Sequence, residues 1–160
     1  MPSKTAFITG ASSGIGQATA HQFAAAGFDL IISARRKSRI DELSRLLVEQ
    51  HGVEVLALEL DVRDQEAVRE SIGSLPKKWQ AIDVLINNAG LSRGLVTIDK
   101  GLISDWDEMI DTNVKGLLYV SRAVTPLMVK RQAGHIINIG SIAGHEVYAN
   151  GAVYCASKHA

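Results

Sequence analysis

The chain alternates short, almost continuous apolar runs with longer stretches in which apolar residues recur at helical spacing. The short runs predict buried β-strands at residues 5–9, 29–34, 53–60, 82–86 and 135–140. The longer stretches predict α-helices at residues 13–26, 37–51, 64–75 and 105–131, and one that begins at residue 152. Strands separated by helix-length segments are typical of parallel βαβ units. The pattern therefore predicts an α/β fold with a doubly wound parallel sheet in three αβα layers.

Particular residues set the expected ends of these helices. Asp64 is a candidate cap for the third helix, and Pro76 ends it. Gly116 and Pro126 lie inside the long helix and are the two positions at which it can bend. A helix that begins near residue 152 is only started at residue 160. We therefore expect a single domain, residues 1–160, that is incomplete at its C-terminus, with the sheet interrupted after the fifth strand.

Composition and charge narrow the classes of partner. The 17 basic residues balance 17 acidic ones, so net charge gives no argument for binding nucleic acid or an anionic membrane. No apolar window is long enough to span a bilayer. We expect no targeting segment, because the first residues run directly into the first predicted strand. Cys155 is the only cysteine, and the five histidines lack metal-ligand spacing. We expect a cytoplasmic protein with no metal.

A glycine-rich loop joins the first predicted strand to the first predicted helix. Within Thr9-Gly10-Ala11-Ser12-Ser13-Gly14-Ile15-Gly16, the three glycines have the spacing G-x-x-x-G-x-G. Glycines at such a junction allow a tight turn and a close approach of the backbone to a pyrophosphate, which the helix N-terminus attracts. A plain glycine turn is the alternative for the motif taken alone. Its position in a βαβ pattern favours a Rossmann-type dinucleotide site.

The end of the second strand indicates which dinucleotide is bound. An enzyme that uses NAD usually places Asp or Glu here for the ribose 2′-hydroxyl. This chain has Ala34, Arg35 and Arg36 instead. Two guanidinium groups can bind a 2′-phosphate through charge-assisted hydrogen bonds. A solvated basic loop is the alternative, but together with the glycine loop these arginines favour NADP.

Several further motifs lie in order along the chain. Thr9 to Gly16 resembles the TGxxxGxG motif of the short-chain dehydrogenase/reductase family, and Asn87-Asn88-Ala89-Gly90 matches the family's NNAG motif. Tyr154 to Lys158 matches YxxxK, Ser141 lies thirteen residues before the tyrosine, and Asn113 matches the family's helix asparagine. The stretches 60–63, 82–85, 109–113 and 134–141 resemble the family's branch of NADP-dependent 3-hydroxy acid dehydrogenases.

This resemblance implies an oxidoreductase that transfers a hydride between nicotinamide and a secondary alcohol or ketone, which in that branch is a small 3-hydroxy acid. Tyr154 would be the acid/base. Lys158, four residues later on the same helix face, would favour its phenolate form and bind the nicotinamide ribose. The resemblance further implies that Ser141 binds the reacting oxygen and that Asn113 holds a water connected to Lys158.

The remaining implied cofactor contacts come from four segments. They are Gly10, Ser12, Ser13, Gly14, Ile15 and Gly16 in the glycine loop, Arg35 and Arg36 after the second strand, Asp61 and Val62 beside the adenine, and Asn87, Ala89 and Gly90 along the cleft. The family commonly forms tetramers, so a homo-oligomer is expected of a full-length protein. A non-catalytic NADP-binding module or an inactive fragment is the alternative, and turnover separates it from the enzyme.

Overall fold

The computed structural model describes residues 3–160. Its centre is a five-stranded parallel sheet in the order β3-β2-β1-β4-β5. The strands are β1 (Thr5–Thr9), β2 (Asp29–Ala34), β3 (Val55–Glu59), β4 (Ile82–Asn87) and β5 (His135–Asn138). The chain builds outward in one direction from β1 to β3 and then crosses back to β4. This reversal of strand order between β1 and β4 is where doubly wound sheets bind ligands.

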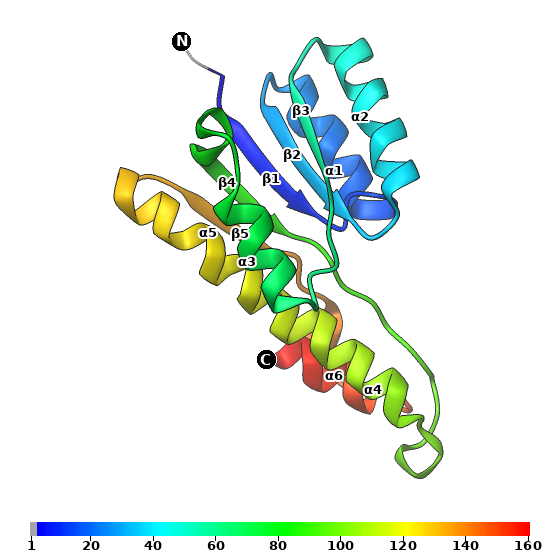
Figure 1. The fold of residues 1–160 in the computed structure, drawn as a ribbon. Helices are drawn as coiled ribbons and strands as arrows, with labels where there is room; N and C mark the ends of the chain where they lie inside the picture. Colours follow the sequence, from blue (N-terminus) through cyan, green and yellow to red (C-terminus); the bar gives the residue numbers. More distant parts are fainter. Residues whose placement is uncertain (1–2) are drawn as a thin grey trace.

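Helices cover both faces of the sheet (Figure 1). The α-helices are α1 (Gly14–Ala25), α2 (Lys37–His51), α3 (Gln65–Gly73), α4 (Ile103–Ile110), α5 (Leu117–Arg131) and α6 (Ala152–His159). A π-helical segment, η3 (Asp111–Gly116), joins α4 to α5, and short 3₁₀ segments are η1 (Lys77–Gln80), η2 (Ile98–Lys100) and η4 (Ile142–Gly144). The predicted three-layer α/β class is confirmed.

The apolar strands create two cores, one on each side of the sheet. All residues of β1 and β2 are buried, as the continuous apolar runs predicted. Successive side chains point to opposite faces, so Ile8 packs in the core with α1 and α2 while Phe7 packs in the core with α3 and α5. Ile40 of α2 and Val120 of α5 are fully buried on these opposite sides. The burial of each helix's apolar stripe thus holds the sheet from both faces.

Most predicted boundaries hold within two residues, and the clearest difference lies in the long helix. It begins at Ile103 rather than at residue 105, and it changes to π-helix at Asp111–Gly116. The irregularity therefore ends at Gly116, whereas Pro126 lies inside regular α5. Gly116 packs closely on the segment after β3, because a Cβ there would be 2.7 Å from Val62 Cγ2. Single π turns are frequent at functional sites, and this one carries Asn113.

The structure places α4, α6 and the segment before α4 beyond the carboxyl ends of the strands (Figure 1). The predicted cap of α3 is confirmed, since the Asp64 carboxylate accepts a hydrogen bond from Ala67 N at 3.0 Å. The helices are also too short or too polar to span a bilayer. Within residues 3–160, no helix combines the length and the apolar character needed to cross a membrane.

Candidate active site

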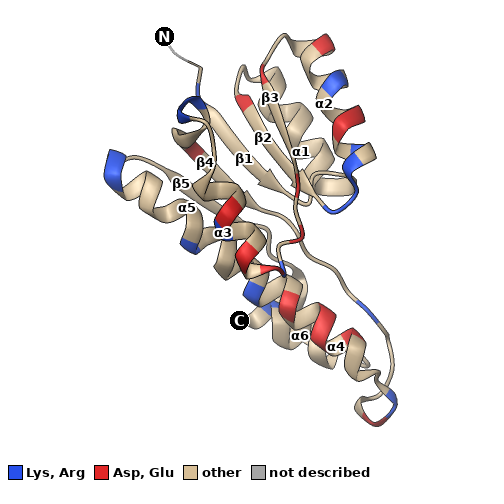
Figure 2. Ribbon diagram, in the orientation of Figure 1, with Lys and Arg blue, Asp and Glu red and all other residues tan. Residues whose placement is uncertain are grey.

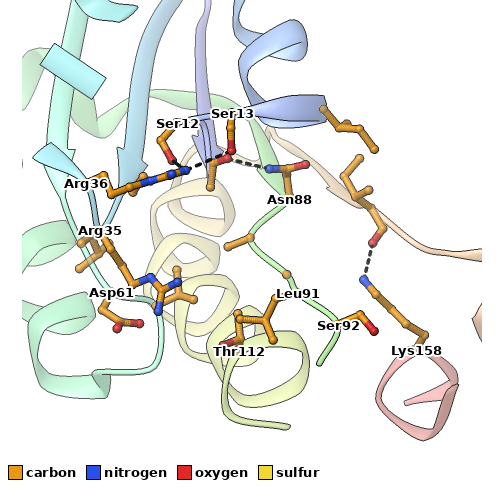
Figure 3. Close-up of a pocket in the computed structure, with 18 of the residues that line it drawn as sticks. Ser12, Ser13, Arg35, Arg36, Asp61, Asn88, Leu91, Ser92, Thr112 and Lys158 are labelled. Carbon is orange, nitrogen blue, oxygen red and sulfur yellow. Dashed lines mark hydrogen bonds between the residues drawn. The ribbon is translucent and has the colours of Figure 1, made fainter. Parts of the chain in front are cut away.

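A cavity of about 630 Å³ opens at the carboxyl ends of the strands and includes the switch between β1 and β4. Its size falls in the range of small-molecule and cofactor sites. Residues predicted from the sequence make up most of its wall: Gly10, Ser12, Ser13, Ile15, Arg35, Arg36, Asp61, Val62, Ala89, Gly90, Tyr154 and Lys158. Figure 3 shows Arg35, Arg36 and Asp61 toward one end and Lys158 at the other.

Each of the three glycines in the loop is required for a different physical reason. Gly10 has φ +66°, and a Cβ there would be 2.8 Å from Ala89 Cα, so the β1 and β4 loops meet at this point. Gly14 has φ +56° with open space around it. Gly16 is packed against the loop itself, because a Cβ would be 2.5 Å from Gly10 O. Gly14 and Gly16 lie outside the cavity wall, and their backbone geometry shapes the loop.

Gly10→Ala is expected to lower the free energy of unfolding by more than Gly14→Ala, measured by urea denaturation of the two variants. Both substitutions place an alanine at a position with a left-handed backbone, which costs about 1–3 kcal/mol. Only the Gly10 variant adds a collision with backbone atoms of Ala89, so the loops have to separate. Equal losses in the two variants would show that the close approach at Gly10 adds nothing.

Asn88 fastens the glycine loop to the end of β4. Its Nδ2 donates to Thr9 O at 2.9 Å and to Gly10 O at 3.1 Å. The backbone N–H groups of Asn88 and Ala89 both donate to Thr9 Oγ1 at 3.1 Å. These bonds hold the two loops that meet at the switch point in one geometry.

The neighbouring Asn87 was expected to line the cleft, and the structure differs on this point. Asn87 Nδ2 donates to Ser121 Oγ and to Asn138 Oδ1, both at 2.9 Å, and the residue lies outside the cavity wall. Asn87 is the last residue of β4 and Asn88 follows it, so the two side chains contact different parts of the structure. The cavity-lining asparagine is Asn88.

The two arginines after β2 have different partners. Arg36 Nη2 donates to Ser12 Oγ at 3.0 Å and to Ser13 Oγ at 3.2 Å, as Figure 3 shows. Arg35 Nη1 instead donates to Glu108 Oε1 of α4 at 3.3 Å. Arg36 therefore joins two loop hydroxyls in a basic, hydrogen-bonding corner, whereas Arg35 faces a carboxylate.

Asp61, the predicted adenine contact, is paired with Arg63. Arg63 Nη2 lies 2.6 Å from Asp61 Oδ2, and Arg63 N donates to Oδ1 at 3.0 Å. Burial alone raises the pKa of Asp61, but the hydrogen bonds and charge of Arg63 outweigh it and hold that pKa below its ordinary value. Asp61 is therefore an ionised acceptor in the cavity wall near neutral pH.

Tyr154 and Lys158 lie on α6 at the other end of the cavity. Lys158 Nζ donates to Ile139 O, after β5, at 3.2 Å. Gly90 leaves room beside the ammonium group, since a Cβ there would be 3.6 Å from Lys158 Nζ and 3.2 Å from Asn113 Oδ1. The half-buried Tyr154 also lines a second cavity of about 330 Å³ formed by the segment before α4, α4 and the start of α6.

Asn113 connects three elements around this end of the site. Its Nδ2 donates to Leu91 O at 2.8 Å and to Ser157 Oγ at 2.9 Å, while its Oδ1 accepts from Leu91 N at 2.8 Å. Both amide hydrogens are thus used within the protein, and Oδ1 retains one acceptor position. The expected water could be held by the side chain only through that remaining position.

Ser141 follows the cavity residues Ile139 and Gly140 but is itself outside the cavity wall. Its Oγ accepts a hydrogen bond from Ala143 N at 3.2 Å and caps η4. That bond uses a lone pair and leaves the hydroxyl hydrogen able to donate. The structure brings Tyr154 and Lys158 into the wall at one end of the site. Asn113 lies behind the wall residue Leu91, to which it is hydrogen-bonded, and Ser141 lies one residue beyond the wall.

Several site residues were missed by sequence reasoning. Asn88 carried a signal, because it lies in the same NNAG motif as its neighbour. Glu108, which lies outside the wall but pairs with Arg35, had no such signal in the sequence, since an acidic residue on an amphipathic helix usually faces water. Leu91, Ser92 and Thr112 also line the cavity and come from the loop after β4 and from η3.

The chain belongs to the short-chain dehydrogenase family, whose model matches residues 4–160. The fold, the glycine loop at the switch point and the Tyr154–Lys158 pair on α6 agree with this assignment.

Among its relatives is the NADP-dependent 3-hydroxy acid dehydrogenase YdfG of Salmonella typhi, 48% identical over 151 residues, which are 94% of this chain and 59% of that protein. The NADP-dependent 3-hydroxy acid dehydrogenase of Schizosaccharomyces pombe is 48% identical over 158 residues, 98% of this chain and 61% of that protein. The solved closed form of serine dehydrogenase complexed with NADP+ superimposes with a TM-score of 0.90 at 44% identity, covering 97% of this chain and 61% of that one. The chain therefore spans about three fifths of the curated relatives it matches.

Proposed function

We propose that the full-length protein is an NADP-dependent oxidoreductase that interconverts a secondary alcohol and a ketone, with small 3-hydroxy acids as substrates. The observation that carries the proposal is one cavity with a basic, serine-supported corner at Arg36 and the Tyr154–Lys158 pair at its other end. The names of relatives nearly half identical to this chain support the cofactor and the substrate class.

The residues of the cavity wall suit the binding of NADP. Ile15 is 63% exposed at the wall, an apolar surface that a bound cofactor would cover. Thr112 also lines the cavity, and its hydroxyl has no hydrogen-bond partner among residues 3–160. Arg36 with Ser12 and Ser13 would bind the 2′-phosphate, the α1 N-terminus would face the pyrophosphate, and Asp61 would accept from the adenine amino group. NADP, when bound, supplies the hydride acceptor or donor of the reaction.

The protein's own part in the chemistry is proton transfer at the substrate oxygen. In oxidation the Tyr154 phenolate would take the proton of the alcohol and become a hydroxyl, and in reduction that hydroxyl would give its proton to the carbonyl oxygen. Lys158, one helical turn away, would stabilise the phenolate that forms. The free O–H of Ser141 would donate to the reacting oxygen, which fixes that oxygen relative to Tyr154.

The second cavity is the proposed place for the body of the substrate because Tyr154 lines both cavities. Arg93 lines this second cavity with its guanidinium group paired to Glu108, and Met109 and Val153 add apolar surface. Leu95, His145, Glu146 and Val147 lie outside both cavity walls.

We further propose that the full-length protein is a cytoplasmic homo-oligomer of the tetrameric type common in the family. Leu118 and Val129 of α5 are 57% and 67% exposed, and apolar side chains exposed on a long helix suit contact with a second copy.

The test is a turnover assay on the full-length protein with NADP+ and a panel of 3-hydroxy acids, including serine, with matched 2-hydroxy acids as controls. The expected result is NADPH formation with 3-hydroxy acids at about tenfold or more the kcat/KM of the controls, because misplacing the hydroxyl leaves polar groups unpaired. NADPH binding without turnover on any alcohol would favour a non-catalytic binding module instead.

A further inference from the structure

Glu108 of α4 gathers arginines from three separate segments beside the cavity. Its Oε2 accepts from Arg93 Nε at 2.8 Å, and its Oε1 lies 3.3 Å from Arg35 Nη1 and 3.5 Å from Arg63 Nη1. Arg35 follows β2, Arg63 follows β3, and Arg93 precedes α4. Figure 2 shows acidic positions along α4 next to basic positions in the neighbouring loops.

This carboxylate is ionised near neutral pH. The side-chain hydrogen bond from Arg93 lowers the pKa of Glu108 more than burial raises it, and Arg35 lowers it further. The Glu108 side chain is only 19% exposed, whereas that of Arg35 is 51% exposed. The Glu108 charge is therefore screened less by solvent than that of a fully exposed acid.

The two arginines in the cavity wall differ in the charge of their hydrogen-bond partners, and this difference affects how each can bind a phosphate. Arg36 donates to the uncharged hydroxyls of Ser12 and Ser13, so its full charge is open to a phosphate. Arg35 lines the same cavity, but part of its charge is already balanced by Glu108. A phosphate that approaches Arg35 also approaches the Glu108 carboxylate, and these two anions repel each other.

We propose that Glu108 is a cofactor-specificity residue, which limits the preference for a 2′-phosphate by competing with it for Arg35. The inference rests on the proposed function only in taking NADP as the cofactor. Removal of the Glu108 charge strengthens binding of the phosphorylated dinucleotide and leaves that of NADH almost unchanged, since NADH carries no 2′-phosphate. Arg36 remains the principal phosphate contact.

The experiment is fluorescence titration of the full-length protein and its Glu108→Gln variant with NADPH and with NADH. The expected result is an NADPH Kd lower by about threefold to fivefold at low salt, the size of one partly exposed ion pair, with the difference shrinking as salt rises. In steady-state assays the change falls on the KM for NADPH more than on kcat. Asp107→Asn is the matched control, because Asp107 is exposed on the same helix and forms no ion pair within residues 3–160.

A double-mutant cycle identifies the arginine through which Glu108 acts. In an Arg35→Ala background, Glu108→Gln is expected to leave NADPH binding unchanged, because the competition has been removed. Unchanged NADPH binding by the single Glu108→Gln variant would overturn the proposal. Weaker NADPH binding would also overturn it and would show that Glu108 instead positions Arg35 for the phosphate. Failure of the parent protein to bind NADPH is a different result and would contradict the proposed function itself.

Discussion

Replacing Tyr154 by phenylalanine is expected to lower kcat of the full-length enzyme by about 10³-fold or more while NADPH still binds. The substitution removes one oxygen and leaves the aromatic ring that lines both cavities. Positioned acid/base groups contribute about 10²–10⁴-fold, and within residues 3–160 no other phenol or carboxylic acid lines the wall beside Lys158. Steady-state kinetics with a 3-hydroxy acid and NADP+ measure the loss.

The control is NADPH titration of the same variant, because Tyr154 touches the cofactor cavity but supplies none of its basic corner. Tyr148→Phe is the matched variant, since it removes an equivalent hydroxyl from a residue outside both cavity walls. Turnover of Tyr154→Phe within an order of magnitude of the parent would assign the proton transfer to another group.

The sheet and its two cores could be predicted because the apolar pattern is nearly continuous in the strands. Ile31 and Ile32 are consecutive and fully buried on opposite faces, which only a sheet covered on both sides allows. Turn and cap chemistry then set boundaries, as at Asp64. The predicted third strand of residues 53–60 was too long at both ends, because Val55–Glu59 is the part that pairs with β2.

The π-helical segment could not be predicted from spacing, because α and π turns have similar apolar patterns over six residues. Its position is set by tertiary contact: Gly116 allows Val62 to approach, and Asn113 bonds to Leu91 and Ser157. Sequence motifs likewise placed Asn113 at the site without indicating which of its atoms are already bonded.

The remaining contacts of the site could not be predicted because they join side chains that are far apart in the sequence. Glu108 lies 73 positions from Arg35 and 15 from Arg93, so no local pattern could indicate that the three residues meet. The same holds for Arg36 with Ser12 and Ser13, which the glycine loop and the basic dipeptide suggested only as separate motifs. The fold joins these segments because β1 and β2 are adjacent strands whose carboxyl ends share one edge.

Arg36→Ala is expected to weaken NADPH binding by about 10- to 100-fold and to leave NADH binding nearly unchanged, measured by fluorescence titration of the full-length protein. A hydrogen bond to a charged group contributes about 1.5–3 kcal/mol, and Arg36 is the cavity arginine whose hydrogen-bond partners are uncharged hydroxyls. The loss should shrink as salt is raised, because part of the interaction is a long-range attraction between charges.

Arg39→Ala is the matched control for this prediction, because Arg39 is exposed on α2, three residues away, and lies outside the cavity wall. It removes the same charge from the surface without touching Ser12 or Ser13, so any general electrostatic effect appears in both variants. Equal weakening of NADPH and NADH binding by Arg36→Ala would mean that this guanidinium shapes the glycine loop through its two serine contacts. Selective loss of NADPH binding would instead assign Arg36 to the 2′-phosphate, since the two cofactors differ in that group alone.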